Sequence, residues 1–137
     1  MDVGLRQRIV AAWSERPDSI RSLPASDAQI AAFERQFGAI PPDLRWFLEE
    51  CGGGVVGSEW VDDIGRLGET HTKFLAESGD PRGWRMEDVF VIGWDKAGNP
   101  FGIHLKSGKV LVEDHDFGGI HEMASSFEAF LEQGLLR

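Results

Sequence analysis

The sequence predicts an α+β fold: a mainly antiparallel, twisted sheet with a central meander, against which N-terminal helices and a C-terminal helix pack. Apolar residues recur at helical spacing in the first third of the chain. Short apolar runs separated by glycine turns follow between residues 89 and 114, and helical spacing returns after residue 125. Because helices and strands occupy separate parts of the chain, an antiparallel sheet is favoured over alternating parallel units. The 137 residues contain no linker-like segment, so we expect a single domain, 1–137.

Three helices are predicted before residue 52. The first covers residues 3–15, where apolar side chains recur at i, i+4 and i+8. The second begins near Ser26, since Ser26 and Gln29 match a capping box in which each side chain binds a free backbone N–H of the other. The third opens at Pro41-Pro42-Asp43, where proline is tolerated, and ends at Gly52-Gly53-Gly54.

The stretch that follows gives weaker signals. Two short strands are predicted at residues 55–56 and 60–61, separated by a Gly-Ser turn. A short helix is expected around residues 71–77, with Phe74 and Leu75 buried.

The clearest strand signal comes from a predicted three-stranded meander. Its strands are residues 89–94, 101–105 and 110–114, joined by glycine-containing turns. The turns suggest a register in which Trp94 faces Phe101 and Leu105 faces Val110. That register collects one core face, consisting of Phe90, Ile92, Trp94, Phe101, Ile103, Leu105, Val110 and Val112. A capped helix starting at Ser125 closes the chain.

Charge and composition exclude several classes of protein. Asp and Glu number 23 against 14 Lys and Arg, which leaves a net charge of −9 and argues against direct binding of a nucleic-acid backbone. No segment approaches the roughly 20 apolar residues that a membrane span needs. The single cysteine, Cys51, excludes an intrachain disulfide. With no export signal at the N-terminus, we expect a cytoplasmic protein without a cofactor.

Two motifs could suggest chemistry, but both have simpler interpretations. Gly52 to Gly57 matches the dinucleotide pattern G-x-G-x-x-G, yet a helix precedes it and a strand follows, which is the reverse of the required context. Asp114, His115, Asp116 and His121 could in principle bind zinc or iron in a metal-dependent enzyme. Because alternate strand residues point to opposite faces, a polar strand end is the favoured interpretation. We expect no metal site, no catalytic residues and no enzyme activity.

Acidic and tryptophan side chains form the predicted partner-binding set. Acids gather after residue 58 and again near residue 114, which indicates an acidic surface that could attract a basic partner. Tryptophan is favoured at binding hot spots. The predicted set is Trp46, Glu59, Trp60, Asp62, Asp63, Trp84, Glu113, Asp114 and Asp116.

Most of the chain resembles a known family. The matching segments are residues 30–38 (IAAFERQFG), 40–48 (IPPDLRWFL), 52–54 (GGG), 89–93, 98–100, 108–110, 114–116 and 124–131. In order and spacing they resemble the SUKH superfamily, which contains the Smi/Knr domain of fungal cell-wall regulators. The resemblance implies an α+β domain without catalytic residues.

The same resemblance implies a role in binding proteins. Bacterial members look like immunity proteins that bind and block a cognate toxin, often a nuclease, in polymorphic toxin systems. Other members are regulatory or scaffold interaction domains without a toxin partner, and this alternative stays open, as do the oligomeric state and the binding surface. We expect a toxin with a basic surface, because the chain is acidic.

Overall fold

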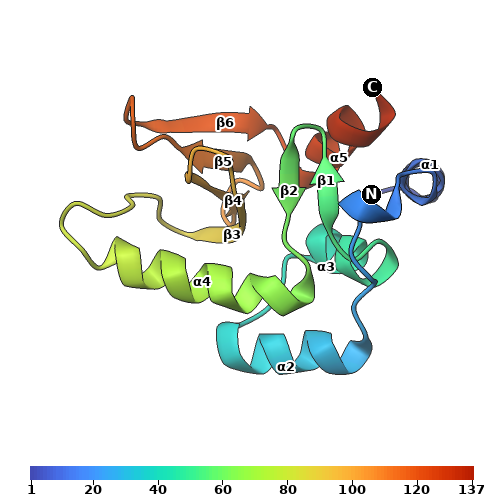
Figure 1. Ribbon diagram of the computed structural model, residues 1–137, viewed down its shortest axis with the longest axis horizontal. Helices are drawn as coiled ribbons and strands as arrows, with labels where there is room; N and C mark the ends of the chain where they lie inside the picture. The colour runs from blue at the N-terminus through green and yellow to red at the C-terminus, as the bar shows by residue number, and fades with distance from the viewer.

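Three helices form the N-terminal part of the fold, which the computed structural model describes for residues 1–137 (Figure 1). They are α1 (Val3–Ser14), α2 (Asp27–Phe37) and α3 (Pro42–Glu50), with a 3₁₀ turn at Asp18–Ile20. All three predicted helices are confirmed. The capping box is present: Gln29 N–H donates to Ser26 Oγ at 3.2 Å, and Ser26 N–H donates to Gln29 Oε1 at 2.9 Å.

The glycine triplet after α3 has a packing role. Gly52, Gly53 and Gly54 all have positive φ, between 97° and 141°. A Cβ on Gly52 would lie 2.3 Å from the carbonyl oxygen of Leu23, so a side chain cannot fit there. Helix α3 precedes the triplet and a strand follows it. The triplet therefore ends a helix against a neighbouring backbone, as the sequence context indicates, and has the wrong setting for a dinucleotide loop.

A short hairpin leads into the longest helix. Strands β1 (Gly54–Val56) and β2 (Glu59–Val61) pair antiparallel, and α4 (Ile64–Ser78) follows. The prediction of a short helix at 71–77 is wrong in length, because α4 has 15 residues and begins at the cap Asp63. Phe74 is buried as predicted, but Leu75 is 65% exposed. Adjacent helix residues are about 100° apart, so Leu75 turns away from the core when Phe74 faces it.

The meander is confirmed, with one strand more than predicted. The sheet has the order β3 (Val89–Trp94), β4 (Pro100–His104), β5 (Val110–Glu113) and β6 (Ile120–Ala124), and α5 (Phe127–Leu136) ends the fold. Figure 1 shows β6 at one edge of this sheet and α4 alongside β3 at the other. At the β3 edge, His71 Nε2 lies 2.8 Å from the carbonyl oxygen of Val91. No strand pairs with the outer edge of β6.

The predicted register is wrong, although most of the predicted core face survives. Ile103 pairs with Val110, two residues from the predicted partner, and a shift of two keeps each side chain on its face. In β3 the register shifts between Val91 and Gly93, which places Trp94 with the side chains of the opposite face. Leu105 lies beyond β4 in the turn and is 57% exposed.

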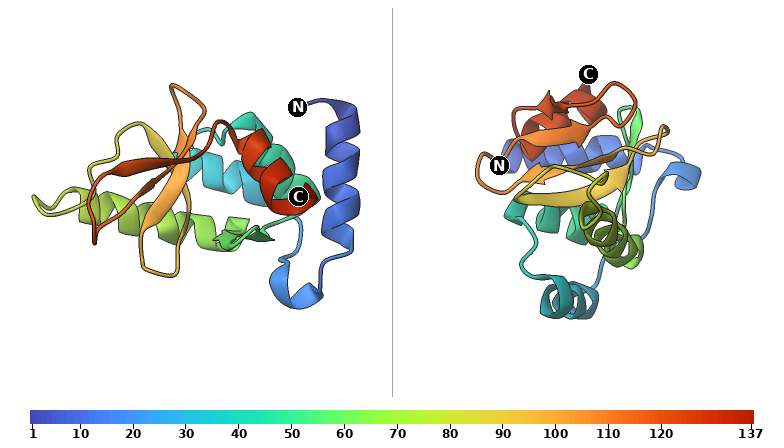
Figure 2. Two further views of the ribbon diagram at one scale, coloured as in Figure 1. Left: turned by 90° about the horizontal axis from the view of Figure 1, so that it is seen from above. Right: turned by 90° about the vertical axis from the view of Figure 1, so that its left-hand side faces the viewer.

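Two apolar clusters lie on opposite faces of the sheet. The main core contains 24 buried residues from all five helices and all six strands, including Phe101 at 0% exposure. The second cluster contains Phe74, Met86 and Val91, with Trp84 and Trp94 packed against it. Figure 2 shows both chain termini at the end of the molecule away from the tip of α4. Trp84 and Trp94, which pack against the second cluster, line the candidate site.

Candidate binding groove

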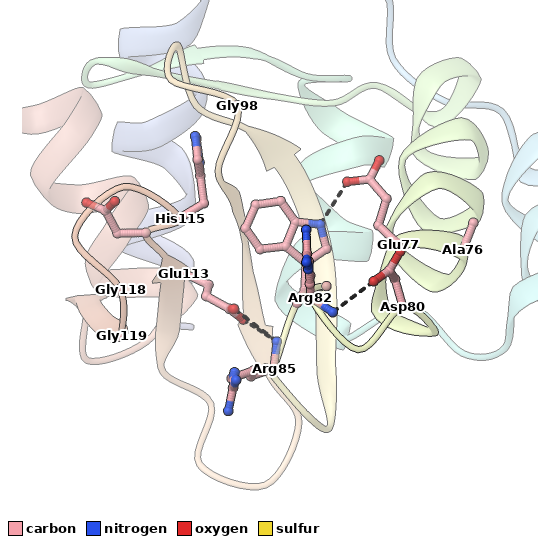
Figure 3. Close-up of a pocket in the computed structure, with 13 residues that line it drawn as sticks. Ala76, Glu77, Asp80, Arg82, Arg85, Gly98, Glu113, His115, Gly118 and Gly119 are labelled. Atoms are coloured by element: carbon pink, nitrogen blue, oxygen red, sulfur yellow. Dashed lines mark hydrogen bonds between the residues drawn. The ribbon is translucent and has the colours of Figure 1, made fainter.

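Two hollows follow one side of α4, and together we call them the α4 groove. The larger hollow, about 680 Å³, lies between the end of α4, residues 80–85 and the β5–β6 turn (Figure 3). The smaller, about 280 Å³, lies between the first turns of α4, β2 and the end of β3. The larger is lined by Glu77, Asp80, Arg82, Trp84, Glu113 and His115, among others. The smaller is lined by Trp60, Asp62, Arg66, Glu69, Thr70, Lys73 and Trp94.

Hydrogen bonds to carboxylates shape the larger hollow. Glu113 accepts the backbone N–H of Arg85 at 2.7 Å, and Asp80 accepts that of Arg82 at 2.8 Å (Figure 3). Glu113 also accepts the backbone N–H of Met86 at 2.8 Å. Trp84 Nε1–H donates to Glu77 at 3.0 Å. The Glu113 bonds tie the loop after α4 to strand β5, because buried backbone N–H groups need an acceptor, and the Trp84 bond ties the loop to α4. Glu113 therefore acts here as a structural acceptor.

The smaller hollow combines indole rings with charged groups. The ammonium of Lys73 lies 4.1 Å from the centroid of the Trp94 ring. Asp62 is 7% exposed and accepts a hydrogen bond from the Thr70 hydroxyl. Burial raises the pKa of Asp62, and the Thr70 hydrogen bond partly offsets that rise. Trp60 Nε1–H is buried and has no hydrogen-bond partner.

The histidine and aspartates near residue 115 build a turn. The Nδ1 atom of His115 is hydrogen-bonded to Asn99 Oδ1, and its Nε2 atom lies 3.2 Å from Asp116 Oδ1. Asp114 accepts the backbone N–H groups of Phe117 and Asp116, which lower the pKa of its carboxyl group. No group of three or more His, Cys, Asp or Glu side chains lies close enough to hold a metal ion.

The structure brings together part of the predicted partner-binding set. Trp60 and Asp62 line the smaller hollow, and Trp84, Glu113 and Asp114 line the larger one. The expectation that Asp62 and Glu113 belong to an exposed acidic surface is wrong, since each is 7% exposed. Both carboxylates are turned inward because nearby donors, a hydroxyl and backbone N–H groups, bind them.

The other predicted residues have different settings. Asp63 caps α4, and Asp116 pairs with His115 beside the larger hollow. Glu59 has a raised pKa because it is partly buried and because the charge of Asp95 lies near. Trp46 lies on α3, away from the groove, with the Arg6 guanidinium 5.3 Å from its ring centroid.

Sequence reasoning missed several groove residues. Lys73, Arg82, Arg85 and Trp94 line the hollows but are absent from the predicted set. Arg66, Glu69, Lys73 and Glu77 recur at intervals of three or four residues. This spacing would have placed all four on one side of a longer α4.

Comparison with known protein families gives a match over most of the chain. The sequence profile of the SMI1/KNR4 family (SUKH-1) matches residues 24–133. The chain belongs to the SMI1/KNR4 family. The family match confirms the resemblance noted from the sequence, and it spans α2 to α5, so both hollows lie inside the SMI1/KNR4 region. No curated protein matches this SMI1/KNR4-family chain.

Membership of the SMI1/KNR4 family indicates the general kind of protein to which this chain belongs. The SMI1/KNR4 family is known for immunity proteins and is generally non-catalytic. None of the helices in this SMI1/KNR4-family chain combines the length and apolar character needed to cross a membrane.

Proposed function

We propose that this protein is a cytoplasmic immunity protein, which binds a cognate protein toxin and blocks it by occlusion rather than by catalysis. Membership of a family known for immunity proteins carries the proposal. The net charge of −9 supports a toxin with a basic surface, such as a nuclease. Complementary charge would speed association and make its rate fall with added salt.

The proposed contacts start from the predicted partner-binding residues that are accessible. Trp60, Trp84, Asp114 and Asp116 lie in or beside the α4 groove and are at least partly exposed, and Glu59 lies next to Trp60 in β2. Buried Asp62 and Glu113 would contribute charge without direct contact. Trp46 and Asp63 lie outside the hollows and are weaker candidates for contact with the toxin.

The decisive experiment uses the protein encoded beside this chain's gene. We expect co-expression to rescue growth from that product's toxic domain, and a pull-down to recover the two proteins in a stoichiometric complex. Stopped-flow association should slow as salt is raised. A neighbouring product that is not toxic, or that remains toxic despite co-expression, would contradict the immunity role. A stable complex with a non-toxic protein would instead favour the regulatory or scaffold alternative.

A further inference from the structure

Aromatic side chains are concentrated in the α4 groove. Three of the five tryptophans, Trp60, Trp84 and Trp94, line it, and all three are partly exposed. The ring centroids of Trp84 and Trp94 lie 5.8 Å apart, so the two hollows meet at this pair. Phe117, in the turn beside the larger hollow, is 91% exposed. Large aromatic side chains at a concave surface are typical anchors for a protein partner.

The charge of the groove favours a cationic occupant. Six carboxyl groups line the two hollows against four cationic side chains, which leaves an excess of two negative charges. The cationic side chains are Arg66, Lys73, Arg82 and Arg85, and none of them forms an ion pair within 4 Å. The exposed groove carboxylates Glu69 and Asp80 therefore have no ion-pair partner among these four cations, and a partner cation can pair with them.

The smaller hollow already shows how a cation binds in this groove. Lys73 places its ammonium over the face of Trp94, and Glu69 precedes Lys73 by one helical turn in the same hollow. Trp84 offers a similar combination in the larger hollow, where Glu77 holds its N–H and Asp80 lies in the adjoining loop. No cation of the chain itself lies over the Trp84 ring.

We propose that the α4 groove is the docking surface and that its occupant is an arginine- or lysine-bearing loop of the partner protein. The partner's cation lies on the face of Trp84 beside Glu77 and Asp80. This assignment rests on the proposed protein-binding function and adds the surface and the chemistry of the docked segment.

The five indole N–H groups provide reporters for a direct test. The ¹⁵N-labelled protein is titrated with an acetylated, amidated Gly-Arg-Gly-Arg-Gly peptide and, separately, with its Glu counterpart, while NMR follows each indole signal. We expect the Arg peptide to shift the signals of Trp84 and Trp94 and to leave those of Trp13 and Trp46 unchanged. Equal shifts with both peptides, or shifts centred on Trp13 or Trp46, would overturn the proposal.

Charge variants separate the groove from the overall charge of the protein. Asp80→Asn and Glu69→Gln should each weaken binding of the Arg peptide about threefold, the effect expected for one exposed ion pair. Glu15→Gln on the α1 side and Glu50→Gln on α3 make the same charge change away from the groove and should have no effect. Lys73→Met removes a competing cation from the groove, so it should tighten binding. Equal losses of peptide affinity in all four acid variants would assign the effect to net charge and refute the proposal that the α4 groove is the docking surface.

The two proposals can fail separately. If Asp80→Lys neutralises the toxin as well as the natural protein does, the immunity role stands and the groove assignment is wrong. If the natural protein binds the Arg peptide through Trp84 but gives no protection against the neighbouring toxin, the groove assignment stands and the immunity role is wrong.

Discussion

The two faces of the four-stranded sheet differ in how they are covered. One face packs into a main core of 24 buried residues, built almost entirely from apolar side chains of the helices and strands. The other has a cluster of three buried residues, and its loop is held by hydrogen bonds to Glu77 and Glu113. The difference separates a scaffold that excludes water from a surface whose shape depends on loops, and binding residues commonly lie on such loops.

The largest effect is expected in the main core. Phe101 is fully buried in β4, with its ring centroid 6.2 Å from that of Phe130 on α5. Phe101→Ala should lower the free energy of unfolding by about 3–5 kcal/mol, because it removes apolar contacts and leaves a cavity. Urea denaturation measures the loss. A loss below about 1 kcal/mol would contradict the assignment of this face as the rigid scaffold.

A smaller and local effect is expected on the opposite face. Glu113→Ala removes the acceptor of the Arg85 and Met86 N–H groups, and leaving buried donors unpaired costs about 1–3 kcal/mol. Hydrogen exchange should accelerate mainly in residues 80–88. Glu122→Ala, which removes only a surface ion pair with Lys109, is the matched control. Uniform loss of protection across α1 and α5 would show that the two faces are not separable.

His71, at the β3 edge of the sheet, should make the free energy of unfolding depend on pH. His71 lies against the rings of Phe33, Phe37 and Phe90, and burial lowers its pKa below 6.5 despite the hydrogen bond to Val91. The unfolded state therefore takes up the proton first, so the free energy of unfolding should fall as pH drops through about 6.5.

Urea denaturation from pH 8 to pH 5.5 tests this pH dependence, above the range in which most carboxylates titrate. His71→Gln should flatten the slope, whereas His104→Gln, at the end of β4, should keep it. An unchanged slope in His71→Gln would assign the pH dependence to another group.

The smallest effect on stability is expected at the tip of the β5–β6 turn. Phe117 is 91% exposed, so Phe117→Ser should change the free energy of unfolding by less than about 0.5 kcal/mol. The same change should raise the dissociation rate of the complex, because a large exposed aromatic side chain beside the groove is expected to pack against the partner. Surface plasmon resonance against the captured toxin measures both rates. Binding that is unchanged in both rates would remove Phe117 from the interface.

Local signals account for the parts of the fold that could be predicted. Proline, capping residues and apolar stripes marked α1, α2, α3 and α5, because helix ends and buried faces depend on nearby residues. The cap of α5 is Ser126, one residue after the predicted Ser125. Strand β6 was missed because Ile120, His121 and Glu122 are all exposed at an open sheet edge, where no apolar alternation is required. The start of α4 was missed because Gly65 and Gly68 lie in its first turns, and Gly68 allows close packing on Phe37.

The sequence by itself determined the fold class, the family and the excess of negative charge, since these depend on residue order and composition. Tertiary structure decided which charges remain accessible and which side chains share a surface. It buried Asp62 and Glu113, turned Trp94 to the second face through a register shift in β3, and joined it there with Trp84. The physical reason is that a groove forms from segments distant along the chain, and its charges depend on hydrogen bonds that only the folded backbone provides.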